Sequence, residues 1–513
     1  MASTTTAGIG AKTARAMFWA YGSYVGSRLL SLISISILAR LLVPRDFGLV
    51  ALAVTFIAFL DLIQGLGISE ALVIGEARDL DERAETAFAI NLGSGFLLAA
   101  LTAAAAPVAA SFFDQPRLIE IMPALGVNFI LIGLGTTHAG IALKGIDFRS
   151  RTIAEVADAL CRGLVSIVLA LLGAGVWSLV IGYLVGTIGW DVVLWRVVPW
   201  RPSFRPQKKH VRALLRFGGS MTGVALAGAF MAQFDNIVIG RVLGATELGF
   251  YSIATRLPML LILNLAVVAG RVLFPAFAML RERGGLERGV LTSLRYTAIV
   301  TLPLAVFVVV LAKPLTLALF GDHWRPAIGA LQVLSLWAAL TTMSMIWGNF
   351  LKACARPDII FKLELPQILA LVVGSIVFVH RGIVAVAWVQ VAIAIAYQVS
   401  LIVVAQRLFG LAVGRVLDAI RPAIFASAGL AVVLLGLRHF VAEPWAVLIA
   451  GGVVGVAVYF GLLRLVAPDV VKLLRTMAFT GPTTPALAAE SVPASSSTSH
   501  GSAPTRARDR RRL

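Results

Sequence analysis

The chain has 513 residues, of which 59% are hydrophobic and only 14% are charged. A soluble domain carries about 25% charged residues, so this composition excludes an ordinary soluble enzyme. The formal net charge of +18 would suggest nucleic acid in a soluble protein. In a membrane protein the same excess collects in cytoplasmic loops, and no nucleic-acid partner is expected.

Apolar runs long enough to cross a bilayer, about 20 residues each, follow one another along the chain. About fourteen are expected, at residues 17–42, 47–70, 86–112, 118–143, 151–172, 175–197, 215–240, 249–273, 288–312, 327–351, 359–380, 382–404, 421–440 and 443–466. The predicted fold class is therefore an all-α polytopic membrane protein. The first run is longer than a signal-peptide core, so we expect it to remain as an uncleaved first helix.

An even number of spans places both termini on one side of the membrane. With a cytoplasmic N-terminus, about 30 of the 44 lysines and arginines fall in cytoplasmic segments and about 8 in outer loops. This bias indicates a multi-pass protein, surrounded by membrane lipids, with cytoplasmic N- and C-termini.

An internal repeat relates the two halves of the chain at an offset of 201 residues. Residues 39–53 read ARLLVPRDFGLVALA and residues 240–254 read GRVLGATELGFYSIA, so that Asp46 corresponds to Glu247 and Gly48 to Gly249. In both loops a glycine allows a tight turn, and an acid lies near the start of the next helix, where the macrodipole favours an anion.

The repeat predicts two related six-helix lobes with the same orientation, followed by two extra helices. The expected domains are an N-lobe over 1–198, a basic cytoplasmic linker over 199–214, a C-lobe over 215–405, two helices over 406–466, and a disordered basic cytoplasmic tail over 467–513. Transporters built from parallel repeats hold their substrate between the halves and alternate access by rocking one half on the other.

The same motifs carry a family resemblance. The segments LARLLVPRDFGLVALA, GLGISEALV (residues 65–73) and FDNIVIGRVLGATELGFYSIA (residues 234–254) resemble the polysaccharide transporter family of the multidrug/oligosaccharidyl-lipid/polysaccharide exporter superfamily, which includes Wzx-type flippases. The resemblance covers about residues 12–470. It implies two lobes in a V-shaped arrangement and movement of an isoprenoid (undecaprenyl) pyrophosphate-linked oligosaccharide across the bacterial inner membrane, for surface or exopolysaccharide synthesis.

Ionisable residues inside the spans are expensive and suggest function by default. Tyr21, Tyr24, Arg28 and Ser31 share one face of the first helix. A polar, cationic stripe in an apolar helix should face a water-filled cavity, and arginine binds phosphate oxygens through a rigid fork of donors. We therefore expect Arg28 to bind the substrate pyrophosphate. Relatives within the superfamily suggest that Arg256, early in the eighth span, faces it.

The acidic candidates have both functional and structural interpretations. Asp61 and Gln64 lie one turn apart on the second helix, and could hold a coupling H⁺ or Na⁺, line the cavity or simply pack. Asp235, beside Gln233 and Asn236, could bind a coupling cation or join helices. Glu155, Asp158 and Arg162 at i, i+3 and i+7 are expected to form an intrahelical network.

No other chemistry is indicated. The six histidines show no ligand spacing and no P-loop occurs, so no metal, cofactor or catalytic residue is expected beyond a coupling ion. The main hypothesis is a non-enzymatic flippase, monomeric by default, working alone or beside polysaccharide polymerase machinery. Two alternatives remain open, namely a drug/cation antiporter of the same architecture and a membrane polysaccharide polymerase or ligase. A polymerase would need reactive groups in an outer loop, of which the longest, about Lys313 to Pro326, holds Asp322, His323 and Arg325.

Overall fold

The computed structural model describes residues 26–64, 79–144, 148–203, 205–207, 211, 228–441 and 443–468, and these segments are helical apart from turns and short connections. Within them, nine helices are long and apolar enough to cross a membrane. Each of the fourteen expected spans contains helix, which confirms the fold class. Helix prevails because a backbone in lipid must satisfy its own hydrogen bonds. Tyr21, Tyr24, most of the tail and parts of the linker lie outside the described residues.

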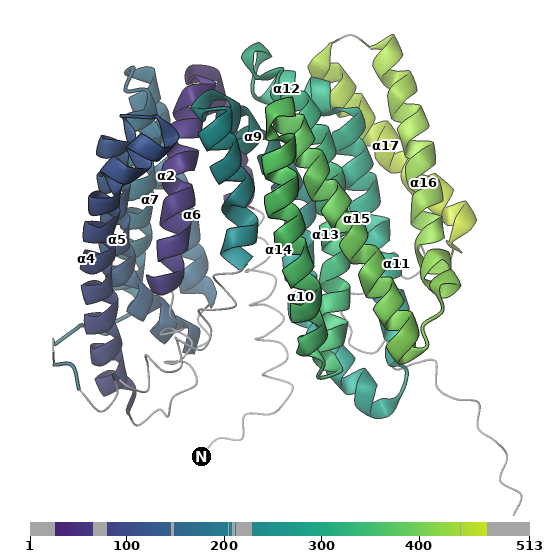
Figure 1. The fold of residues 1–513 in the computed structure, drawn as a ribbon, viewed down its shortest axis with the longest axis horizontal. Helices are drawn as coiled ribbons and strands as arrows, with labels where there is room; N and C mark the ends of the chain where they lie inside the picture. Colours follow the sequence, from purple (N-terminus) through teal and green to yellow (C-terminus); the bar gives the residue numbers. More distant parts are fainter. Residues whose placement is uncertain are drawn as a thin grey trace, which may run out of the picture. The chain divides into compact units, whose positions relative to one another are not determined.

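The first helix group comes from the first half of the chain. It contains a helix over residues 26–41, α2 (Pro44–Gln64), α4 (Leu80–Phe113), α5 (Leu118–Lys144), α6 (Phe148–Leu171) and α7 (Val176–Val197). Within the group α4 packs on α5, α5 on α7, and α6 on α7 (Figure 1). Glycines bring these helices close together: Gly95 of α4 lies against the backbone of Phe129, and Gly133 of α5 against that of Asn91.

The second helix group comes from the rest of the chain. It contains a helix over residues 228–242, α9 (Ala245–Pro258), α10 (Asn264–Arg283), α11 (Leu286–Val310), α12 (Ala312–Leu319), α13 (Ala327–Ala353), α14 (Pro357–Phe378), α15 (Ile383–Phe409), α16 (Val413–Phe440) and α17 (Pro444–Val466). Helix α13 packs against α9, α10, α11 and α15, and α16 packs on α11. A π-helical turn, η2 (Met259–Leu263), joins α9 to α10 directly after Pro258, which has no amide hydrogen to donate.

The two groups meet where α2 and α9 begin. A Cβ atom on Gly48 would overlap the carbonyl oxygen of Ala245, and one on Gly249 would overlap that of Pro44. Pro44 and Ala245 are repeat equivalents, as are Gly48 and Gly249, so each half makes the same contact to the other. The contact is therefore pseudo-twofold symmetric. Each glycine is needed because only a residue without a side chain allows backbones this close.

A loop of the second group adds to this contact. After α12, the short helix η3 (Asp322–Trp324) presents Trp324, which is fully buried and lies edge-on to Phe47 of α2 and Phe250 of α9. Its indole Nε1 donates to the carbonyl oxygen of Ala39 at 2.7 Å. Arg40 donates to the carbonyls of Ala318 and Leu319 at the end of α12. This end of the bundle is tightly joined.

Candidate functional site

Helix α6 carries a stripe of charges that is unusual for a helix between apolar neighbours. Arg151, Glu155, Asp158 and Arg162 lie at i, i+4, i+7 and i+11 and so share one face. Arg151 Nε is 3.1 Å from Glu155 Oε1, and a terminal nitrogen of Arg162 is 2.8 Å from Asp158 Oδ1. The expected network on this helix exists, but it consists of two separate pairs, and Arg151 takes part in it.

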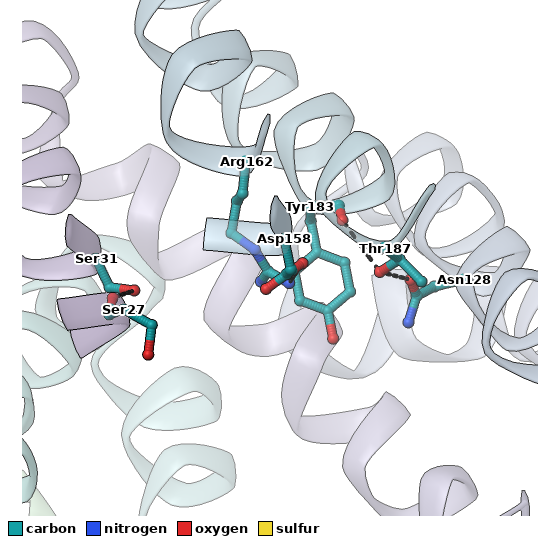
Figure 2. A network of polar contacts seen from close by, with 7 residues as sticks. All are labelled: Ser27, Ser31, Asn128, Asp158, Arg162, Tyr183 and Thr187. Carbon is teal, nitrogen blue, oxygen red and sulfur yellow. Dashed lines mark hydrogen bonds and ion pairs between the residues drawn. The ribbon is translucent and has the colours of Figure 1, made fainter. Parts of the chain in front are cut away.

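Contacts with α7 hold the side chain of Arg162 in place. Its guanidinium lies over the ring of Tyr183 on α7, 4.3 Å from the centroid (Figure 2). Gly186, one turn further along α7, leaves room for the arginine stem, because a Cβ there would come within 2.9 Å of Arg162 Cβ. The Nε of Arg162 is buried and has no hydrogen-bond partner among the described residues, but the side chain as a whole is 38% exposed. An anion can therefore reach the arginine.

A second cation comes from the other helix group. Arg256 lies in the last turn of α9, two residues before Pro258, and its side chain is exposed. The charge of Arg162 reaches Arg256. Because Asp158 pairs with Arg162 alone, the second cation leaves positive charge that an anion can balance. The two arginines are therefore a candidate anion site to which both halves of the chain contribute.

Polar groups surround this pair of arginines. Asp61 of α2 is exposed, and its charge reaches the hydroxyl of Tyr183. The helix over residues 26–41 packs on α6, because Ser34 fills the space beside Gly163. Figure 2 draws Ser27 and Ser31 of that helix with Asp158 and Arg162, and the Ser31 hydroxyl donates to the carbonyl oxygen of Ser27 at 2.8 Å. Hydroxyl, phenol and carboxylate groups of this kind suit the hydroxyl groups of a sugar.

The residues predicted for the site differ in their surroundings, since one is exposed and another is buried. Arg28 is exposed on the helix over 26–41, and its role in binding the pyrophosphate stays a prediction. Gln64, expected on the cavity face, is instead buried, and its Nε2 donates to the carbonyl oxygen of Phe129 at 2.5 Å. Its amide thus joins α2 to α5 inside the first group.

Asp235 lies inside the second group and is fully engaged. It is buried and accepts hydrogen bonds from the Tyr251 hydroxyl at 2.6 Å, the Gln390 amide at 3.3 Å and the backbone NH of Asn236 at 2.9 Å. These partners tie the helix over 228–242 to α9 and α15. Three donors around one carboxylate are what a structural acid needs.

Sequence reasoning did not single out two important positions. Tyr183 orders Arg162, but it lies on the next helix and nothing in its own neighbourhood marks it. Asp191 of α7 is buried with neither carboxylate oxygen paired. The rule that ionisable residues within spans are functional candidates could have found it.

These features define a polytopic helical membrane protein with a candidate anion site to which both of its helix groups contribute. The family model described as "Polysaccharide biosynthesis protein" matches residues 37–329, which is more than half of the chain. The protein belongs to this family.

Individual relatives agree with the family. The succinoglycan biosynthesis transport protein ExoT of Rhizobium meliloti is 29% identical over 92% of this chain and 96% of its own length. The lipopolysaccharide biosynthesis protein WzxC of Escherichia coli is 24% identical over 65% of this chain and 68% of its own.

Solved structures show the same fold. The lipid II flippase MurJ in an inward closed conformation matches with a TM-score of 0.71 at 15% identity, covering 88% of this chain and 99% of that chain. An inward-facing multidrug resistance transporter of the MATE family matches with a TM-score of 0.60 at 20% identity, covering 77% and 96%.

Proposed function

We propose that this protein is a flippase that moves an isoprenoid pyrophosphate-linked oligosaccharide across the bacterial inner membrane, for the synthesis of a surface or extracellular polysaccharide. The observation that carries the proposal is the pair Arg162 and Arg256, two cations from different helix groups, the first of which acts electrostatically on the second. Relatives named for the transport of succinoglycan and the synthesis of lipopolysaccharide support it.

The chemistry of the substrate fits the site. A pyrophosphate joins the lipid to the sugar, so a carrier must hold its negative charge at membrane depth. Two guanidinium forks supply donors in the geometry that phosphate oxygens require. Asp158 neutralises Arg162 in the empty site, 2.8 Å away, and the substrate exchanges with it. The arginine is thus never left without a counter-ion between the apolar helices.

The two ends of the bundle have different roles in this proposal. The symmetric contact of α2 with α9, reinforced by Trp324, closes the outer side, and the substrate enters from the cytoplasmic side, where both termini lie. Parting α2 from α9 then opens the outer side. A membrane potential that is negative inside favours outward movement of an anion by about 2.3 kcal/mol per charge per 100 mV. The protein acts as a monomer and delivers its product to polymerase machinery.

The outer loop gives no support to a polymerase. Asp322 is exposed and paired with Arg325 at 2.7 Å, and this hydrogen bond holds the pKa of the carboxyl below its ordinary value, the opposite of what a general acid needs. The His323 ring is hydrogen-bonded to the carbonyl oxygen of Ala39 at 2.7 Å. Both side chains serve the packing of this loop. A drug/cation antiporter should offer carboxylates to its cargo, whereas the exposed pair here is cationic.

The test uses variants in cells whose own gene has been deleted. Arg162→Ala and Arg256→Ala should each lower the export of surface polymer roughly 10- to 100-fold, which corresponds to the loss of a charged hydrogen bond worth about 1.5–3 kcal/mol. Arg162→Lys should restore part of the export, because lysine carries the positive charge but lacks the planar guanidinium that binds two phosphate oxygens at once. Arg151→Ala is the matched control, since it breaks the other i, i+4 pair of the same helix. Normal export by both alanine variants would show that the site is assigned wrongly.

A further inference from the structure

One buried acid plays no part in the proposed anion site. Asp191 lies in the last part of α7, with 7% of its surface exposed, and among the residues that the structure describes neither Oδ1 nor Oδ2 has a hydrogen-bond partner. Its carboxyl group lies against bare backbone, because a Cβ on Gly135 of α5 would overlap Oδ1. The glycine therefore creates the space that the acid occupies.

The energetics of this arrangement are unusual. An isolated carboxylate buried in an apolar environment is far more costly than the neutral acid, and the neutral acid without a partner still costs roughly 2–7 kcal/mol. Asp235 shows how the same protein accommodates a structural acid, with three donors. Asp191 has no such donor among the described residues. In this conformation its surroundings therefore favour the protonated acid, and the side chain does not stabilise the fold.

A row of side chains links Asp191 to the arginine site. Tyr183, Thr187 and Asp191 follow one another at i, i+4 and i+8 along α7. The Thr187 hydroxyl donates to Asn128 Oδ1 on α5 at 2.7 Å, and Figure 2 shows this pair next to Tyr183 and Arg162. Asp191 thus lies two turns from the phenol under the Arg162 guanidinium. A movement of α7 that serves one group must move the other.

The titratable groups on the helices packed against α7 leave Asp191 without a charged partner. They are Glu120, His138 and Lys144 on α5, Arg149, Arg151, Glu155, Asp158, Cys161 and Arg162 on α6, and Arg45, Asp46 and Asp61 on α2, with Tyr183 and Arg196 on α7 itself. None of them is hydrogen-bonded to Asp191. The His138 ring stacks on Trp195. Cys161 lies against Gly189, and Arg162 pairs with Asp158.

We infer that Asp191 is a proton-binding site of the transport cycle. It holds a proton in the present conformation. When α5 and α7 part and water reaches the carboxyl group, the O–H bond breaks, its electron pair stays on the carboxylate, and the proton passes to water. Alternate exposure of Asp191 to the two sides couples inward proton flow to outward transport. This inference rests on the proposed function, but the protonation itself does not.

Protonation is tested on the full chain alone, without substrate. Purified protein in lipid nanodiscs at neutral pH should show the infrared carbonyl band of a protonated carboxylic acid, sensitive to exchange into heavy water. Asp191→Asn, which keeps the shape of the neutral acid, should remove that band. Asp235→Asn, the matched control in the other helix group, should leave it. An unchanged band in Asp191→Asn would overturn the inference.

A second variant covers the case in which Asp191→Asn does not fold. Gly135→Ala adds a methyl group where the carboxyl oxygen lies and should shift the band, whereas Gly93→Ala, where a Cβ meets open space, should not. A band that Gly135→Ala leaves in place would count against the assignment.

Coupling is tested in cells. Export by the wild type should fall at least tenfold when a protonophore abolishes the proton gradient, and the residual export by Asp191→Asn should be insensitive to it. If Asp191→Asn exports normally and remains sensitive to the protonophore, another group carries the proton. If Arg162→Ala and Arg256→Ala also export normally, the proposed function fails, and the infrared result still decides whether Asp191 is protonated.

Discussion

At the scale of single residues, the charged side chains between these helices differ in how many hydrogen bonds and ion pairs they make. Asp235 is saturated by three donors. Arg162 is paired with Asp158, but its side chain remains 38% exposed. Asp191 is unpaired on both oxygens. A saturated group stabilises the fold, whereas a group with spare capacity can bind something else.

The role of Asp235 can be tested by truncation. Asp235→Ala would leave the Tyr251 hydroxyl and the Gln390 amide buried without their acceptor, at about 1–3 kcal/mol for each unsatisfied group. We expect a clearly lower midpoint of thermal unfolding in detergent. Asp61→Ala, which removes an exposed acid, should leave the midpoint close to that of the wild type. Equal midpoints for the two variants would show that Asp235 is not structural.

At the scale of elements, the contact between α2 and α9 is the one most sensitive to side-chain size. Gly48 and Gly249 each lie against the carbonyl of the residue that begins the opposite helix. The packing of Trp324 on Phe47 and Phe250 spans the same junction. Because both helices begin there, a small change in their angle would separate the two groups at this end.

The closing role of this contact leads to a specific prediction. Gly48→Leu should force α2 from α9 and favour the state that is open at this end. Spin labels at exposed Val43 and Thr246 should then show a longer distance distribution than in the otherwise wild-type chain. Gly93→Leu, on an open face of α4, is the control. If Gly48→Leu leaves the distance unchanged, this contact does not close the bundle.

At the scale of the whole molecule, the sequence predicted where the helices lie along the chain better than it predicted which helices contact one another. Length and hydropathy determine a membrane span almost alone, and each expected span contains helix. The repeat predicted that Gly48 and Gly249 are equivalent, but not that each would touch the other half. Equivalence can be read along the chain, whereas contact depends on how the two groups meet.

The candidate site was predictable only in part. Asp158 and Arg162 are one turn apart, so an intrahelical pair explained both and concealed the spare capacity of the arginine. Its neighbour Tyr183 comes from α7, and Arg256 comes from the other half of the chain. For Gln64 the sequence left both cavity lining and packing open, because the side of α2 that faces α5 is set by tertiary packing. Periodicity identifies a shared face but not what lies opposite it.

The central claim is that this protein carries a lipid-linked oligosaccharide from the inner to the outer leaflet. The most direct measurement is the leaflet in which that lipid accumulates when the gene is absent. Spheroplasts would be treated with a sugar-modifying reagent that cannot cross the membrane, with and without restoration of the gene. We predict that without the protein the lipid-linked units build up in a form the reagent cannot reach and surface polymer disappears, and that restoring the gene reverses both. Units that reach the outer leaflet but stay unpolymerised would contradict the claim and place the protein after the flipping step.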